Sequence, residues 1–91
     1  MKKIGIVDDS KPFVLLVRQL LESENVIVEA FEDAIEFFRI PSRIPSYDLI
    51  ILDINLPDRD GLDVLAQLKR TDGLREVPVL LLSGDSRPEI V

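Results

Sequence analysis

The sequence predicts an α/β domain with a parallel β-sheet and helices on both of its faces. Four short runs rich in Ile, Val and Leu alternate with segments whose apolar residues have the spacing of helices. Each connecting segment is long enough for a right-handed crossover between parallel strands. The 91 residues are expected to form one domain, residues 1–91, at the small end of the usual size range.

The four apolar runs are predicted to be strands. Three of them are almost continuous in Ile, Val and Leu, which is typical of strands covered on both faces. The second run carries Glu29, which favours a more solvent-exposed position such as the edge of the sheet. The runs are Lys3–Val7, Val26–Phe31, Leu49–Leu52 and Val77–Leu82.

Three segments between these runs are predicted to be helices. The first, residues 11–24, has a helical apolar stripe, with Ser10 as a candidate N-cap and Pro12 in the first turn. The second, Asp33–Arg39, precedes two prolines within residues 40–46 that are expected to end it. The third is Gly61–Arg70, with Leu62, Leu65 and Leu68 on one side.

The composition excludes several classes of chemistry. Because the chain has no cysteine and no histidine, disulfides, Ser–His triads, Cys–His pairs and almost all zinc sites are excluded. The net charge of −6 argues against nucleic-acid binding, which needs a basic surface. No apolar stretch approaches the ~20 residues that span a bilayer, and the basic start is too short for a secretory signal. A cytoplasmic protein without a membrane partner is therefore expected.

Carboxylates gather where the predicted strands end. Asp8 and Asp9 follow the first strand, Asp53 follows the third and Ser83 follows the fourth. Ligands of open parallel sheets bind beyond the carboxyl ends of the strands. Two like charges ~4 Å apart cost ~4 kcal/mol at an effective dielectric constant of ~20, a large part of the stability of a small domain. A hard divalent cation would reverse the sign of this term, and the oxygen ligands suit magnesium.

The loop after Asp53 reads INLPDRDG. Pro57 stiffens this loop, and Gly61 permits a positive φ or a close backbone approach. The stiff loop would hold the backbone carbonyl of Asn55 near the metal. Ser83 and Gly84 would offer a hydroxyl and backbone N–H groups to phosphoryl oxygens. The other carboxylates of the region are expected to be solvated: Asp58, Asp60, Asp63 and Asp85.

These motifs together resemble the receiver domain of two-component response regulators. The matching features are the Asp8-Asp9 pair after the first strand, Asp53 with LPDRDG behind it, and Ser83 after VPVLLL. The resemblance runs through all 91 residues and implies a flavodoxin-like, three-layer αβα fold with a parallel sheet in the order 2-1-3-4. The haloacid-dehalogenase-like phosphatases fit less well, because they carry Asp-x-Asp where this chain has Asp53-Ile54-Asn55.

The resemblance also implies roles for these residues. Asp53 would be the phosphoacceptor, and Ser83 would bind the phosphoryl group. Asp9, Asp53 and the carbonyl of Asn55 would bind Mg2+ directly, while Asp8 would act through a water molecule. The donor would be a sensor histidine kinase or a phosphotransfer protein, with an output domain or downstream protein as a further partner. Such a domain is an acceptor that can hydrolyse its own aspartyl phosphate, not a turnover enzyme.

The resemblance implies parts of the family that this sequence lacks. Receiver domains continue through a fifth strand, which supplies a lysine to the phosphorylation site, and through further helices. We therefore expect a truncated receiver domain with impaired phosphoryl transfer. The capping-box pattern of Ser86 and Glu89 predicts that a helix begins there. VPVLLLS would then form an exposed strand edge, which predicts a homodimer or a strand-exchanged oligomer. The alternative function is an interaction or assembly module that is not phosphorylated.

Overall fold

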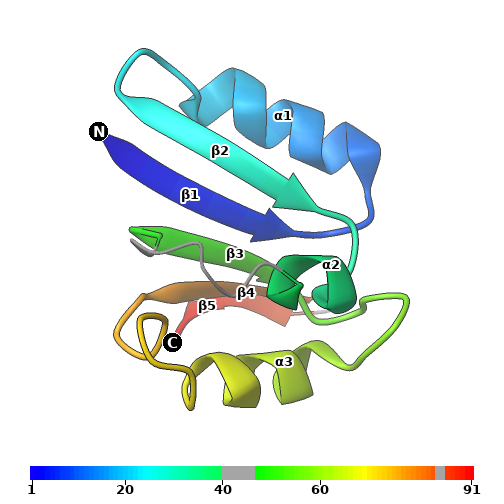
Figure 1. Ribbon diagram of the computed structural model, residues 1–91. Coiled ribbons are helices and arrows are strands. Elements are labelled where there is room, and N and C mark those ends of the chain that lie inside the picture. The colour runs from blue at the N-terminus through cyan, green and yellow to red at the C-terminus, as the bar shows by residue number, and fades with distance from the viewer. Residues whose placement is uncertain (40–46, 84–85) are drawn as a thin grey trace.

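A five-stranded β-sheet runs through the centre of the computed structural model (Figure 1). The structure describes residues 1–39, 47–83 and 86–91. In chain order, its elements are β1 (Lys2–Val7), α1 (Lys11–Leu21), β2 (Val26–Phe31), α2 (Ala34–Phe38), β3 (Leu49–Asp53), α3 (Gly61–Leu68), β4 (Val79–Ser83) and β5 (Ser86–Ile90).

The strands are arranged in the order β2-β1-β3-β4-β5, and the first four are parallel. This confirms the predicted order 2-1-3-4 and the position of β2 at one edge. Val7, at the end of β1, pairs with Phe31 of β2 on one side and with Leu52 of β3 on the other. The carboxyl ends of these strands consequently lie beside one another.

Apolar side chains cover both faces of the sheet and form two separate clusters. The cluster between the sheet and the helices α2 and α3 includes Phe37, Val64 and Leu68. The cluster between the sheet and α1 includes Val17 and Ile51. The helices therefore lie on opposite faces, which confirms the three-layer αβα architecture.

Each helix begins at a polar residue whose side chain accepts a hydrogen bond from the first turn. Ser10 Oγ accepts from Phe13 N (3.3 Å) and Asp33 Oδ1 accepts from Glu36 N (2.8 Å). The first helix ends at Leu21, three residues earlier than predicted. The prolines expected to end the second helix lie outside the described residues. No helix in the described ranges is long and apolar enough to cross a membrane.

The segment that follows Ser83 forms a strand, so the predicted helix at the Ser86–Glu89 capping box is wrong. β5 pairs with β4 in the antiparallel sense, and Val79 and Val91 exchange backbone hydrogen bonds of 3.0 and 2.8 Å. A capping box is only a local signal. Pairing with the edge of β4 satisfies the backbone groups of residues 86–91 instead.

β4 is accordingly not the exposed edge that the sequence predicted, because β5 covers it. The register between β4 and β5 shifts between Leu81 and Ser83. Pro88 lies in this outer strand, and proline is tolerated on edge strands and at bulges because it has no N–H to donate. The edges of the described sheet are β2 and β5.

Gly61 lies against the backbone that follows β3. A Cβ atom at this position would be 2.4 Å from Ile54 Cα and 2.6 Å from the carbonyl oxygen of Asp53. Gly61 N also donates to the carbonyl of Ile54 (2.8 Å). Of the two possibilities that the sequence offered for this glycine, close approach is therefore the reason for its presence.

We predict that Gly61→Ala destabilises the domain by about 3 kcal/mol, because its methyl group would overlap rigid backbone atoms. Gly73→Ala is the matched control, since Gly73 has a φ of 85° and its replacement strains only one residue, by roughly 1–2 kcal/mol. Urea unfolding followed by circular dichroism measures both changes. A smaller loss for Gly61→Ala than for Gly73→Ala would contradict the prediction.

Candidate functional site

Three carboxylates meet at the carboxyl ends of β1 and β3. Asp8 and Asp9 follow β1, and Asp53 is the last residue of β3. One carboxylate oxygen from each lies within 4.8 Å of the others. Asp8 is buried, with 7% of its surface exposed, while Asp53 is half-buried and Asp9 is exposed. The structure thus brings together the three carboxylates that the sequence assigned to one site.

Backbone hydrogen bonds fix the positions of these side chains. Asp8 N donates to the carbonyl of Phe31 (2.9 Å), which extends the β1–β2 pairing by one residue. Asp8 Oδ1 accepts from Ser10 N (2.8 Å), and Asp53 Oδ1 accepts from Asn55 N (3.0 Å). One oxygen of each carboxylate is therefore held by the loop that follows it.

The charge of this site is not balanced by the described part of the chain. Burial raises the pKa of Asp8, and the nearby charges of Asp53 and Asp9 raise it further, while the hydrogen bond from Ser10 N acts in the opposite direction. Within residues 1–39, 47–83 and 86–91, no lysine or arginine forms an ion pair with these carboxylates. Such a cluster of hard oxygen atoms suits a divalent cation.

The two remaining predicted residues flank the same strand end. Ser83 ends β4, one residue beyond Leu82, which pairs with Asp53. Ser83 is half-buried and Asn55 is exposed. Asn55 is the second residue of the loop after β3 and forms an isolated backbone bridge with Asp60. Gly84 lies outside the described residues.

Two loop carboxylates that were expected to be solvated are exposed, and they also cap helices. Asp60 Oδ1 accepts from Leu62 N (2.8 Å) and caps α3. The carboxylate of Asp58 accepts from Ala34 N (3.2 Å) and Ile35 N (2.9 Å) at the start of α2. Burial acts to raise the pKa of Asp58, but these hydrogen bonds outweigh it and lower the pKa.

The expectation of solvation holds for Asp63, which is exposed, while Asp85 lies outside the described residues. The role of Asp60 could have been found in the sequence, because an aspartate directly before a helix is an N-cap signal. No local signal could have found the role of Asp58, whose partner Ala34 is 24 residues away.

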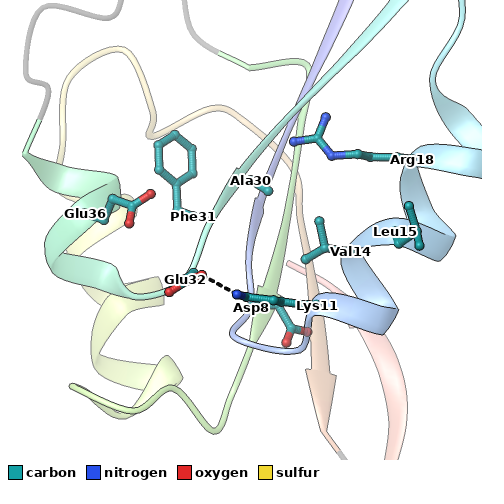
Figure 2. A pocket seen from close by; sticks show the side chains of 9 residues that line it. All are labelled: Asp8, Lys11, Val14, Leu15, Arg18, Ala30, Phe31, Glu32 and Glu36. Carbon is teal, nitrogen blue, oxygen red and sulfur yellow. Dashed lines mark ion pairs between the residues drawn. The ribbon is translucent and has the colours of Figure 1, made fainter.

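A groove of about 330 Å³ lies beside Asp8, between α1 and β2 (Figure 2). Val14, Ala30 and Phe31 form part of its apolar lining. Lys11 and Glu32 form an ion pair across it, with Nζ and Oε1 4.0 Å apart, and connect the start of α1 to the residue after β2. Because both side chains are highly exposed, this pair contributes little to stability.

The chain is similar to known proteins along almost its whole length. Residues 4–91 match the family model of the response regulator receiver domain. The chain is 34% identical over 90 residues to response regulator Rcp1 of Synechocystis sp., and 36% identical over 87 residues to the transcriptional regulatory protein CpxR of Escherichia coli. These alignments cover 90% and 92% of the chain but only 61% of Rcp1 and 34% of CpxR.

Solved structures show the same likeness. The Mn(2+)-bound form of Rcp1 matches 96% of this chain and 68% of its own, with a TM-score of 0.81 and 29% identity. The phosphorylated cyanobacterial phytochrome response regulator RcpA matches 94% of this chain and 67% of its own, with a TM-score of 0.81 and 33% identity. The family match, the shared fold and the acidic strand ends agree, and the chain belongs to the response regulator receiver domain family.

Proposed function

We propose that this chain accepts a phosphoryl group on Asp53 from a sensor histidine kinase or a phosphotransfer protein. The observation that carries the proposal is the convergence of Asp8, Asp9 and Asp53 at the strand ends of a receiver domain. Solved relatives include a Mn(2+)-bound and a phosphorylated response regulator, which supports the same chemistry here.

The donor set fits Mg2+. Oxygen ligands of one Mg2+ ion lie at most about 4.2 Å apart, twice the Mg–O distance. The carboxylate oxygens here lie within 4.8 Å of one another, which suits direct binding by some of them and binding through water by another. In this proposal Asp9, Asp53 and the carbonyl of Asn55 bind the ion directly, and Asp8 binds through a water molecule. When bound, the ion supplies neutralisation of the phosphoryl and carboxylate charges.

The residues of the chain carry out the transfer by positioning. An oxygen of Asp53 attacks the phosphorus of a phosphohistidine, and the new O–P bond forms as the N–P bond breaks. The electron pair of the N–P bond stays on the ring nitrogen, and the histidine, already protonated on its other ring nitrogen, leaves as neutral imidazole. Asp53 Oδ1 accepts a hydrogen bond from Asn55 N, so the other carboxylate oxygen of Asp53 is the one that attacks. Ser83 Oγ donates a hydrogen bond to a phosphoryl oxygen. Water later hydrolyses the aspartyl phosphate, so the chain is a transient acceptor.

Transfer to residues 1–91 is expected to be slow. The resemblance implies that a lysine on a further strand contacts the phosphoryl group. Residues 1–91 contain no lysine that matches this motif. Lys69 cannot replace it, because its Nζ donates to the carbonyl of Val77, ahead of β4 and at the opposite end of that strand from Ser83. The output partner would be a domain or protein in the same cytoplasmic compartment. The family match and the acidic cluster favour phosphoryl acceptance over the alternative of an unphosphorylated assembly module.

We predict that incubation with Mg2+ and a small phosphodonor adds one phosphoryl group to the chain, slowly and only at Asp53. Intact-mass spectrometry measures the addition. Asp53→Asn removes the attacking oxygen and should abolish it, while Asp63→Asn, an exposed control on α3, should leave it unchanged. Modification that survives in Asp53→Asn would overturn the assignment.

We predict that Asp8→Asn stabilises the metal-free domain by about 1 kcal/mol, which corresponds to roughly 4–8 °C in Tm. Asn keeps the oxygen that accepts from Ser10 N but removes a buried charge. Because the folded-state pKa of Asp8 is raised, its ionisation destabilises the fold at neutral pH. That penalty disappears as the pH falls through this pKa, so the two proteins should converge in acid.

Thermal unfolding in a chelating agent measures this effect, and Glu24→Gln is the control because Glu24 is exposed and forms no ion pair within the described residues. Added Mg2+ should stabilise the wild type more than Asp8→Asn. A lower Tm for metal-free Asp8→Asn would contradict the prediction.

We also propose that the chain forms a homodimer, through the α1 face of the sheet instead of the edge of β4. Leu20 on α1 is 72% exposed, and Ile90 on β5 is 69% exposed. Ile90 pairs directly with Leu80, whose side chain packs with the α1 cluster, so Ile90 belongs to the same face. A dimer through this face would remove the apolar surface of Ile90 from water, which favours association.

Light scattering at tens of micromolar (~50 µM, where a micromolar Kd leaves most protein dimeric) should therefore show a dimer. Ile90→Ser should shift the protein toward monomer. Leu62→Ser, which alters a leucine on α3 that is 50% exposed, should not. A wild type that is monomeric at this concentration would refute the dimer.

A further inference from the structure

The loop that carries the phosphoacceptor site also holds the start of α2. We propose that Asp58 is a positioning residue for the site at Asp53, and that it couples occupancy of that site to the N-terminus of α2. This inference rests on the proposed function, because it concerns the same Mg2+ and phosphoryl site. Asp58 does not touch the site itself and would act through the loop.

The loop between β3 and α3 behaves as one unit because it is closed at its base. Asn55 and Asp60 form a backbone bridge, and Gly61 N donates to the carbonyl of Ile54 (2.8 Å). Asp60 also caps α3. Asp58 lies at the tip of this closed loop. A displacement of its side chain would therefore also move Asn55 and Ile54.

The tip of the loop is attached to both ends of α2. The carboxylate of Asp58 accepts one hydrogen bond from Ala34 N and one from Ile35 N, with both of its oxygens engaged. The guanidinium of Arg59 lies over the ring of Phe38, 5.9 Å from its centre, at the other end of the helix. α2 and the loop are therefore joined by two adjacent loop residues.

Charge strengthens the first attachment. The N–H groups at a helix start carry partial positive charge and stabilise an anion. The pKa of Asp58 is lowered by these same hydrogen bonds, so the ionised form is the one that the fold favours. Asp58 is consequently ionised at neutral pH and accepts two hydrogen bonds, although it is exposed.

The link makes binding at the site and order at α2 interdependent. Without the Asp58 bonds, the loop samples more positions and the carbonyl of Asn55 is a poorer ligand. Linkage is reciprocal, so a cation that fixes the loop must also tighten the bonds from Ala34 and Ile35. Both consequences can be measured, one as affinity and the other as amide protection.

The experiment compares Asp58→Ala with Asp33→Ala in the full chain. Asp33 is a matched control because it also caps α2, by accepting from Glu36 N, but it is not part of the loop after β3. Asp58→Asn keeps one acceptor oxygen and serves as the conservative variant. Titration with Mg2+ alone gives the affinity, and hydrogen exchange gives the protection of the Ala34 and Ile35 amides.

We expect Asp58→Ala to weaken Mg2+ binding by about tenfold, the lower end of what the loss of a ligand-orienting group costs. Asp58→Asn should fall between it and the wild type, and Asp33→Ala should weaken Mg2+ binding much less than Asp58→Ala, because it leaves both bonds to Asp58 in place. In the wild type, Mg2+ should slow exchange at Ala34 and Ile35, and in Asp58→Ala it should not.

Two failures are distinguishable. Absence of Mg2+ binding by the wild type would overturn the proposed function and this inference together. Wild-type binding that is matched by Asp58→Ala, or weakened equally by Asp33→Ala, would overturn the role of Asp58 and leave the proposed function standing.

Discussion

The parallel register of β1 against β3 is the constraint on which the site depends. Because Val7 pairs with Leu52, the next residues, Asp8 and Asp53, emerge side by side. A slip of one residue would move one carboxylate ~3.3 Å along the strand direction and turn the buried side chains to the wrong face. The two apolar clusters on the faces of the sheet oppose that slip, so the core that stabilises the fold also fixes the geometry of the carboxylates.

The closed loop after β3 is the second structural feature on which the geometry of the site depends. Only glycine at position 61 lets the chain come close enough for its N–H to donate to the carbonyl of Ile54. The loop closed in this way is short, and Asp58 at its tip reaches α2. The sequence pattern Pro57 to Gly61 thus has a structural result beyond stiffness. It connects the end of a central strand to a helix on the face of the sheet.

Local patterns were sufficient to predict most of the fold, and topology was sufficient to predict the acidic site. Apolar runs predicted the first four strands, and parallel connections then placed Asp8, Asp9 and Asp53 together. β5 was not predicted, because Ser86 and Glu89 have the spacing of a capping box, which favours a helix. The Gly84-Asp85 pair before them is a sequence signature of a two-residue hairpin connection, which favours a strand. The cap that Asp58 forms on α2 was missed for another reason, since a contact across 24 residues leaves no periodic or local trace.

The carboxylates of this region divide into two groups according to what the fold does with their charge. Asp58 and Asp60 accept hydrogen bonds from backbone N–H groups at helix starts, and the pKa of Asp58 is lowered as a result. Asp8 also receives an N–H, yet its pKa is raised, because burial and two neighbouring charges outweigh one hydrogen bond. The fold therefore stabilises the negative charge of some aspartates, such as Asp58, with backbone N–H groups. It leaves the charges of the cluster around Asp8 without sufficient compensation. An uncompensated cluster lowers the stability of the empty domain, and only a group that arrives from outside can remove that cost.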